Sequence, residues 1–179
     1  TQALVDCYTV REALGCQSFE GLNVTIVGDI KHSRVARSNI SAFTMLGAQV
    51  TLVAPPTLMP AHTNQWPVRV SHSLDEVIAS TDVLYMLRLQ SERMDQGLIP
   101  NLGEYGNRFG LTDVRAQKLQ SSAVVMHPGP MNRGLEISAE SADSHKSVVL
   151  AQVSNGVLVR MAVLYQLLGG AALTGEVGA

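Results

Sequence analysis

Short apolar runs alternate with amphipathic segments along most of this chain. Runs typical of buried strands lie at residues 24–27, 50–53, 82–87 and 123–126, with a weaker run at 68–70. Between the first two, residues 34–46 carry apolar side chains at helical spacing, and Gly47 is a stop signal. Strand, helix and strand in this order predict a βαβ unit with parallel strands. The whole pattern predicts an α/β fold, a three-layer α/β/α sandwich around a mostly parallel, four- to five-stranded, Rossmann-like sheet.

Both ends of the chain carry helical patterns. One runs over residues 1–14, and near the C-terminus two more are predicted at 147–153 and 157–168, separated by the turn signal Asn155-Gly156. The last of these is apolar on nearly all sides, which is typical of a helix buried all round. We therefore expect one domain over residues 1–179, a piece of something longer, whose terminal helical regions at 1–15 and 147–170 pack on a missing part.

Composition and charge exclude several classes of function. Charged residues make up 16% of the chain and the formal net charge is −2, so neither nucleic acid nor an anionic membrane is expected as a partner. No uninterrupted apolar stretch reaches the roughly 18 residues of a membrane span. Cys7 and Cys16 lack zinc-ligand spacing, as do the histidines, so we expect no metal site and a cytoplasmic chain with reduced thiols.

The turn after the first predicted strand is poor in glycine. Residues 28–33 read Gly-Asp-Ile-Lys-His-Ser, without the glycine pattern that lets a nucleotide phosphate approach the backbone. NAD and ATP are therefore not expected, and no other cofactor is indicated. Residues 90–111 are polar and rich in Gly, Asn and Pro, which predicts a long functional or mobile loop.

Two arginines, Arg34 and Arg88, follow the carboxyl ends of different predicted strands. Ligands of parallel sheets gather at these ends, and two guanidinium forks suit a small dicarboxylate. The alternative is that each arginine caps its helix or pairs with a nearby acid, since surface pairs are common and weak.

His127-Pro128-Gly129-Pro130 follows the last predicted strand. Such a segment fixes the backbone and presents carbonyls that can accept hydrogen bonds from an amide NH₂ group, and a cis bond before Pro130 would suit it. A simple rigid turn is the alternative, and on these residues alone the commoner case. We expect His127 to be structural rather than a catalytic base.

Together these motifs resemble the catalytic chain of bacterial aspartate carbamoyltransferases. The similar segments are Gly28-Asp29 with Arg34 and Ser38, Arg88-x-Gln90-x-Glu92-Arg93, and 127–137, which begins His-Pro-Gly-Pro. Residues 1–4 (Thr-Gln-Ala-Leu) resemble the end of the family's His-Pro-Thr-Gln-Ala-Leu motif. The similarity runs from Thr1 to about residue 170 and covers the family's aspartate-binding half.

The resemblance implies a carbamoyltransferase-type fold and transfer of the carbamoyl group of carbamoyl phosphate to the amine of L-aspartate, in pyrimidine biosynthesis. It implies that Arg34 and Arg88 bind the two aspartate carboxylates and that Gln90 helps to order Arg88 and the bound aspartate. The loop at 90–111 would close over aspartate.

For carbamoyl phosphate, the resemblance implies that Gln2 and the carbonyls of Pro128 and Gly129 hold the carbamoyl NH₂ group. The Gly129–Pro130 peptide would be cis. No catalytic residue is assigned to this half, because the family's phosphate cradle, a further arginine, a histidine and a neighbouring subunit's lysine lie elsewhere.

It follows that this chain alone is expected to be inactive and that the complete enzyme is expected to be a homotrimer. An ornithine carbamoyltransferase is one alternative, although it would not need a second carboxylate-binding arginine at Arg88. A non-catalytic structural or regulatory domain of the same fold is the other.

Overall fold

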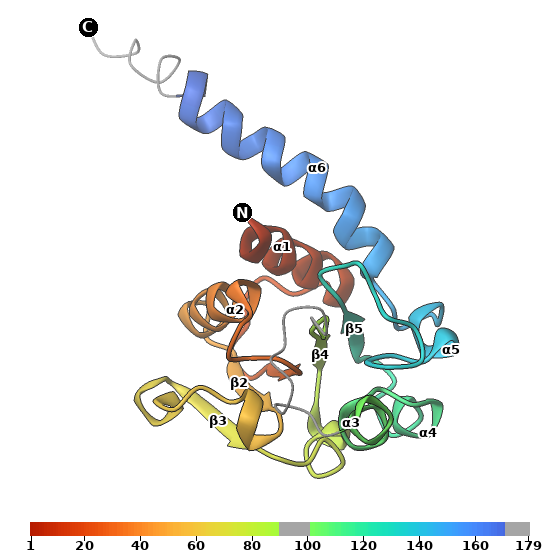
Figure 1. Ribbon diagram of the computed structural model, residues 1–179. Coiled ribbons are helices and arrows are strands. Elements are labelled where there is room, and N and C mark those ends of the chain that lie inside the picture. The colour runs from red at the N-terminus through yellow and green to blue at the C-terminus, as the bar shows by residue number, and fades with distance from the viewer. Residues whose placement is uncertain (90–100, 171–179) are drawn as a thin grey trace, which may run out of the picture.

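The computed structural model of the chain describes residues 1–89 and 101–170 (Figure 1). Its centre is one five-stranded sheet in the order β3-β2-β1-β4-β5. The strands are β1 (Asn23–Val27), β2 (Gln49–Val53), β3 (Val68–Ser71), β4 (Val83–Met86) and β5 (Val124–Met126). All neighbouring pairs are parallel, and Val24 of β1 lies between Val50 of β2 and Val83 of β4. The strand order reverses between β1 and β4, and such a switch point forms a crevice at the carboxyl ends of the strands.

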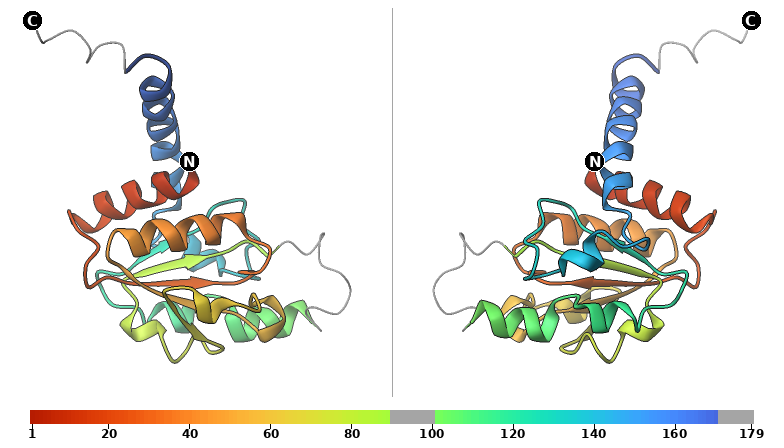
Figure 2. Two further views of the ribbon diagram at one scale, coloured as in Figure 1. Left: turned by 90° about the vertical axis from the view of Figure 1, so that its left-hand side faces the viewer. Right: turned by 90° about the vertical axis from the view of Figure 1, so that its right-hand side faces the viewer.

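Helices cover both faces of the sheet, which confirms the three-layer prediction (Figure 2). α1 (Gln2–Leu14) and α2 (Arg34–Met45) lie on one face, and α3 (Leu102–Phe109) and α4 (Asp113–Ala116) lie on the other. Two more helices follow, α5 (Ala139–Ala142) and α6 (Val149–Tyr165), and α6 continues into a π-helical turn at Gln166–Gly170. Short 3₁₀ turns occupy Pro56–Leu58, Thr63–Gln65 and Ile78–Ser80.

Local sequence explains the βαβ unit well. Strands covered on both faces are apolar without alternation, and every residue from Val24 to Val27 is buried. α2 begins where the Ser33 hydroxyl accepts a hydrogen bond from the Ala36 N–H at 3.1 Å. Its buried face includes Phe43, whose ring centroid lies 5.9 Å from that of Phe19.

α3 was not predicted, because its glycines resemble loop signals. Asn101 caps it by accepting hydrogen bonds from the N–H groups of Gly103 and Glu104. A Cβ on Gly110, just after the helix, would lie 2.6 Å from the carbonyl oxygen of Leu135. Glycine here therefore permits close backbone packing, and the loop prediction was wrong for this part of residues 90–111.

The predicted break at Asn155-Gly156 was also wrong, because both residues lie inside α6. The Asn155 amide donates to Thr9 Oγ1 at 3.1 Å and to Glu12 Oε2 at 2.9 Å, and both acceptors belong to α1. A Cβ on Gly156 would lie 2.5 Å from Nη1 of Arg160 in the same helix, and at an ordinary contact distance of 4.0 Å from Val5 of α1. Asn155 thus serves helix packing rather than a turn.

Beyond Gly156, α6 extends away from the sheet (Figures 1 and 2). Its buried residues lie in the first half, whereas five apolar residues of the second half are more than half exposed: Val157, Leu158, Met161, Leu164 and Tyr165. Nothing within the described residues covers these side chains, and the expectation that this helix packs on a missing part stays a prediction. None of the helices in residues 1–89 and 101–170 combines the length and apolarity needed to cross a membrane.

A salt bridge ties α4 to the turn after β3. Asp75 accepts hydrogen bonds from Arg115 Nη2 at 2.7 Å and from Lys118 Nζ at 2.9 Å. These hydrogen bonds lower the pKa of Asp75 from 3.8 to about 2. Because the pKa is lowered in the folded chain, this stabilisation is complete above the unfolded value and is lost as the pH falls towards 2.

Replacing Asp75 with asparagine is expected to lower the free energy of unfolding at neutral pH by about 0.5–1 kcal/mol, a figure reduced for solvent screening. The Asp75 side chain is 44% exposed, which is the reason for that reduction. Urea unfolding from pH 7 down to about pH 2 should show the variant and the parent converging at the acid end. Asp143→Asn, which breaks the more exposed pair with Arg133, is the control and should have a smaller effect. A stability difference that does not change with pH would contradict the assignment.

Candidate functional site

The candidate site is a pocket of about 190 Å³ at the carboxyl ends of β1 and β4. Four segments form it: the start of α1, the β1–α2 turn, the end of β4 and the loop after β5. Its lining residues are Gln2, Asp29, His32, Ser33, Val35, Leu87, Arg88, Pro128 and Gly129. The pocket therefore occupies the switch point where parallel α/β domains bind their ligands.

The pocket unites most of the residues predicted for the site. Gln2, Arg88, Pro128 and Gly129 all line it, and Pro130 follows directly in the chain. Gln90 lies outside the described residues, so the role expected for it stays a prediction.

Arg34 occupies a different place from Arg88. It is the first residue of α2, between the lining residues Ser33 and Val35, but its own exposed side chain does not line the pocket. Within the described part of the chain, Arg34 forms no ion pair with an acidic side chain, so the alternative of a local salt bridge is not found for it.

The loop after β5 presents hydrogen-bond acceptors without free N–H donors. Pro128 and Pro130 have no N–H group, and the Gly129 N–H donates to His127 Nδ1 at 2.9 Å. The peptide between Gly129 and Pro130 is cis, which confirms that prediction, and Gly129 has φ +65°. Residues 128–130 can therefore offer a ligand carbonyl oxygens but no backbone donor.

His127 is held by hydrogen bonds at both ring nitrogens. Since Nδ1 accepts from Gly129, the proton lies on Nε2, which donates to Glu136 Oε1 at 3.2 Å. Both side chains are fully buried, and the same carboxylate oxygen accepts from the Asn132 N–H at 2.6 Å. The expectation of a structural His127 agrees with these contacts. Glu136 supports the loop and was not predicted to do so, although it lies within the 127–137 motif.

The β1–α2 turn brings His32 to the pocket. The buried Asp29 carboxylate accepts from the His32 backbone N–H at 3.1 Å, and its Oδ1 lies 2.9 Å from His32 Nδ1. Sequence analysis did not predict His32 as a pocket residue, and the available signal was an acid three positions earlier in a tight turn. No three His, Cys, Asp or Glu side chains in residues 1–89 and 101–170 are placed to hold a metal ion.

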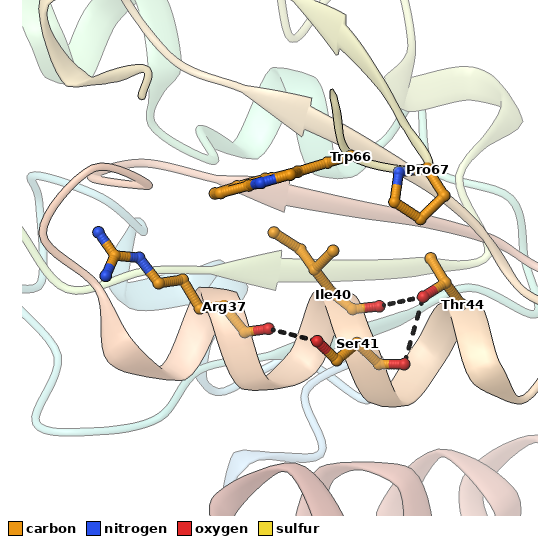
Figure 3. Close-up of a pocket in the computed structure, with 6 residues that line it drawn as sticks. All are labelled: Arg37, Ile40, Ser41, Thr44, Trp66 and Pro67. Carbon is orange, nitrogen blue, oxygen red and sulfur yellow. Dashed lines mark hydrogen bonds between the residues drawn. The ribbon is translucent and has the colours of Figure 1, made fainter. Parts of the chain in front are cut away.

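A second pocket, of about 260 Å³, lies between α2 and the chain before β3 (Figure 3). The indole of Trp66 lies over Ile40, with Pro67 beside it. The two hydroxyl groups that line this pocket already donate hydrogen bonds to backbone carbonyls of α2. Ser41 does so at 3.3 Å and Thr44 at 2.7 Å. Because this pocket offers few available polar groups, the pocket at the switch point remains the candidate site.

At the switch point of this parallel α/β domain, the pocket therefore combines a guanidinium group with a loop that offers backbone carbonyls and no backbone donor. The family described as "Aspartate/ornithine carbamoyltransferase, Asp/Orn binding domain" matches residues 20–167. The chain belongs to this family.

Curated relatives named aspartate carbamoyltransferase catalytic subunit are similar over nearly the whole of this chain. The aspartate carbamoyltransferase catalytic subunit of Thermobifida fusca is 60% identical over 171 residues, which cover 96% of this chain and 54% of that subunit. The catalytic subunit of Mycobacterium ulcerans is 54% identical over 179 residues, covering 100% of this chain and 55% of that subunit. The chain therefore spans about half the length of the curated relatives it matches.

Solved structures have the same fold. The aspartate transcarbamoylase of Trypanosoma cruzi in complex with carbamoyl aspartate and phosphate matches with a TM-score of 0.77 at 30% identity, over 92% of this chain and 54% of that one. An ornithine carbamoyltransferase from Thermus thermophilus matches with a TM-score of 0.78 at 24% identity, over 93% of this chain and 54% of that one, which bears on the fold alone.

Proposed function

We propose that this chain is the aspartate-binding half of an aspartate carbamoyltransferase, which transfers the carbamoyl group of carbamoyl phosphate to L-aspartate in pyrimidine biosynthesis. The observation that carries the proposal is the pocket that unites Gln2, Arg88 and the Pro128–Gly129 segment. The names of the relatives at 54–60% identity and the carbamoyl aspartate bound to the Trypanosoma cruzi enzyme support it.

In this proposal each pocket group has a distinct task. The Arg88 guanidinium binds one aspartate carboxylate through two parallel hydrogen bonds. Arg34 takes the other carboxylate once its exposed side chain turns towards the pocket that its neighbours line. Gln2 and the carbonyls of Pro128 and Gly129 accept hydrogen bonds from the carbamoyl NH₂ group, which the acceptor-only character of that loop favours.

The reaction also needs groups from the other half of the enzyme. When the amine attacks the carbamoyl carbon, negative charge grows on the carbonyl oxygen and phosphate leaves, so donors placed beforehand near both are required. We propose that the exposed apolar side chains of α6 pack on the carbamoyl-phosphate half. A homotrimer in the cytoplasm is the corresponding assembly.

The test is a hybrid enzyme in which this chain replaces the matching region of the Thermobifida fusca subunit. The hybrid should form carbamoyl aspartate from carbamoyl phosphate and L-aspartate, and the isolated chain should form none above the uncatalysed rate. Assaying the hybrid with L-ornithine separates the alternatives, because Arg88 suits a second carboxylate and not an amine. A folded hybrid that prefers ornithine, or that transfers to neither amino acid, would contradict the proposal.

A further inference from the structure

Asp6 is a fully buried carboxylate at the junction of four elements. Its Oδ1 accepts from Gln2 Nε2 at 2.8 Å and from Gln152 Nε2 at 2.9 Å. Its Oδ2 accepts from Asn39 Nδ2 and from the Tyr85 hydroxyl, both at 2.8 Å. These partners belong to α1, α6, α2 and β4, so one side chain links four elements through hydrogen bonds to neutral groups.

The chemistry of Asp6 fixes the orientation of two amides. An ionised carboxylate only accepts, so each glutamine must direct its NH₂ group towards Asp6 and its oxygen away from it. For Gln152, the oxygen then accepts from the His127 N–H at 3.0 Å, where the 127–130 loop begins. For Gln2, the oxygen accepts from Arg160 Nη2 at 3.2 Å. Both orientations follow from the partners and not from the placement of nearly identical amide atoms.

Burial keeps two groups around Asp6 protonated. Burial, followed by the charge of Asp6, raises the pKa of Tyr85 well above its ordinary value, so its hydroxyl remains a donor. The same two causes raise the pKa of the neighbouring Cys7 thiol to about 12. The Tyr85 hydroxyl and the Cys7 thiol are therefore expected to stay protonated across the physiological pH range.

We propose that Asp6 is a positioning residue for carbamoyl phosphate: it orients the Gln2 amide so that an oxygen, and not an NH₂ group, is available to the carbamoyl NH₂. Through Gln152 it also holds the start of the loop that supplies the Pro128 and Gly129 carbonyls. This proposal rests on the proposed function, because it assigns Gln2 to the carbamoyl group. Asp6 itself does not line the pocket.

The hydrogen bonds are tested on the unmodified chain, without any activity. Nuclear magnetic resonance should show side-chain NH₂ protons of Gln2 and Gln152 that exchange with water more slowly than those of an exposed glutamine such as Gln65. Exchange of both at the rate of Gln65 would overturn the proposal, whatever the hybrid enzyme does.

The effect on the substrate is tested in the hybrid enzyme with Asp6→Asn. An asparagine that directs its NH₂ group towards Gln2 removes the acceptor of the Gln2 amide, which leaves only the hydrogen bond from Arg160 to orient that amide. The KM for carbamoyl phosphate should rise roughly five- to tenfold, the range expected for one lost hydrogen bond. The KM for aspartate should stay within about twofold. Thr25→Val is the matched control, because it also removes a buried hydrogen bond, from Thr25 to Thr81 at 2.7 Å, and has no contact with Asp6.

A double-variant cycle with Gln2→Met separates positioning from general destabilisation. If Asp6 acts through Gln2, most of the effect of Asp6→Asn on the KM for carbamoyl phosphate should disappear in the Gln2→Met background. An unchanged effect there, or an equal effect of Thr25→Val, would overturn the proposal. If the hybrid with Asp6 intact is inactive, the proposed function fails, while the exchange measurement still reports on the Asp6 cluster.

Discussion

Replacing Arg88 with alanine is expected to lower kcat/KM for aspartate in the hybrid enzyme by about a thousandfold. Truncating one partner of a desolvated, hydrogen-bonded charge pair leaves the other charge unpaired, which costs several kcal/mol. Arg88 follows the end of β4 and lines the pocket, so its truncation removes the guanidinium group that we propose binds one aspartate carboxylate. Steady-state kinetics with aspartate varied at saturating carbamoyl phosphate measure the effect.

Two further variants show whether the fork or only the charge matters. Arg88→Lys keeps the charge but not the planar pair of donors, so we expect it still to lower kcat/KM for aspartate by about a hundredfold. Arg69→Ala is the control, because this exposed arginine of β3 donates to Gln49 at the sheet edge and not to the pocket. It should change kcat/KM by less than about twofold. A fully active Arg88→Ala hybrid would exclude Arg88 from aspartate binding.

The strands were predictable because of how a parallel sheet is buried. Strands covered on both faces need no polar side, so they appear as continuous apolar runs, and four of the five were plain in the sequence. Helix ends were less predictable where glycine has a packing role. Gly110 lets the backbone of Leu135 approach, and Gly156 leaves room for the Arg160 guanidinium group, yet both resemble turn signals in a single sequence.

The sequence predicted those site residues whose place in the pocket depends only on their following a strand. Residues that follow parallel strands meet at one edge of the sheet, and this brought Arg88 and Gly129 into one pocket. The direction of the Arg34 side chain does not follow from its position, because an exposed arginine has many rotamers of similar energy.

Asp6 could not be predicted in the same way. It is hydrogen-bonded to Asn39, Tyr85 and Gln152, which lie 33 to 146 positions away in the chain. No local sequence pattern therefore predicts the cluster.

Replacing Glu136 with alanine is expected to lower the free energy of unfolding by about 3 kcal/mol. The variant leaves the buried His127 Nε2–H without its acceptor and the Asn132 N–H without its bond of 2.6 Å. It also opens a void, because the Glu136 side chain is fully buried. Urea unfolding of the chain at neutral pH, followed by circular dichroism, measures the loss.

Glu136→Gln is the matched variant for this prediction. A glutamine keeps an oxygen that can accept from both His127 and Asn132, and it removes the charge, so its cost should be about 1 kcal/mol or less. Within the described residues Glu136 Oε2 has no hydrogen-bond partner, so burying that oxygen already opposes folding. If Glu136→Ala were as stable as the parent, the cost of burying the carboxylate would equal what its two hydrogen bonds contribute, and the 127–130 loop would need another anchor. The expected order, with alanine well below glutamine and glutamine close to the parent, shows that the charge of Glu136 is not what holds the loop in place.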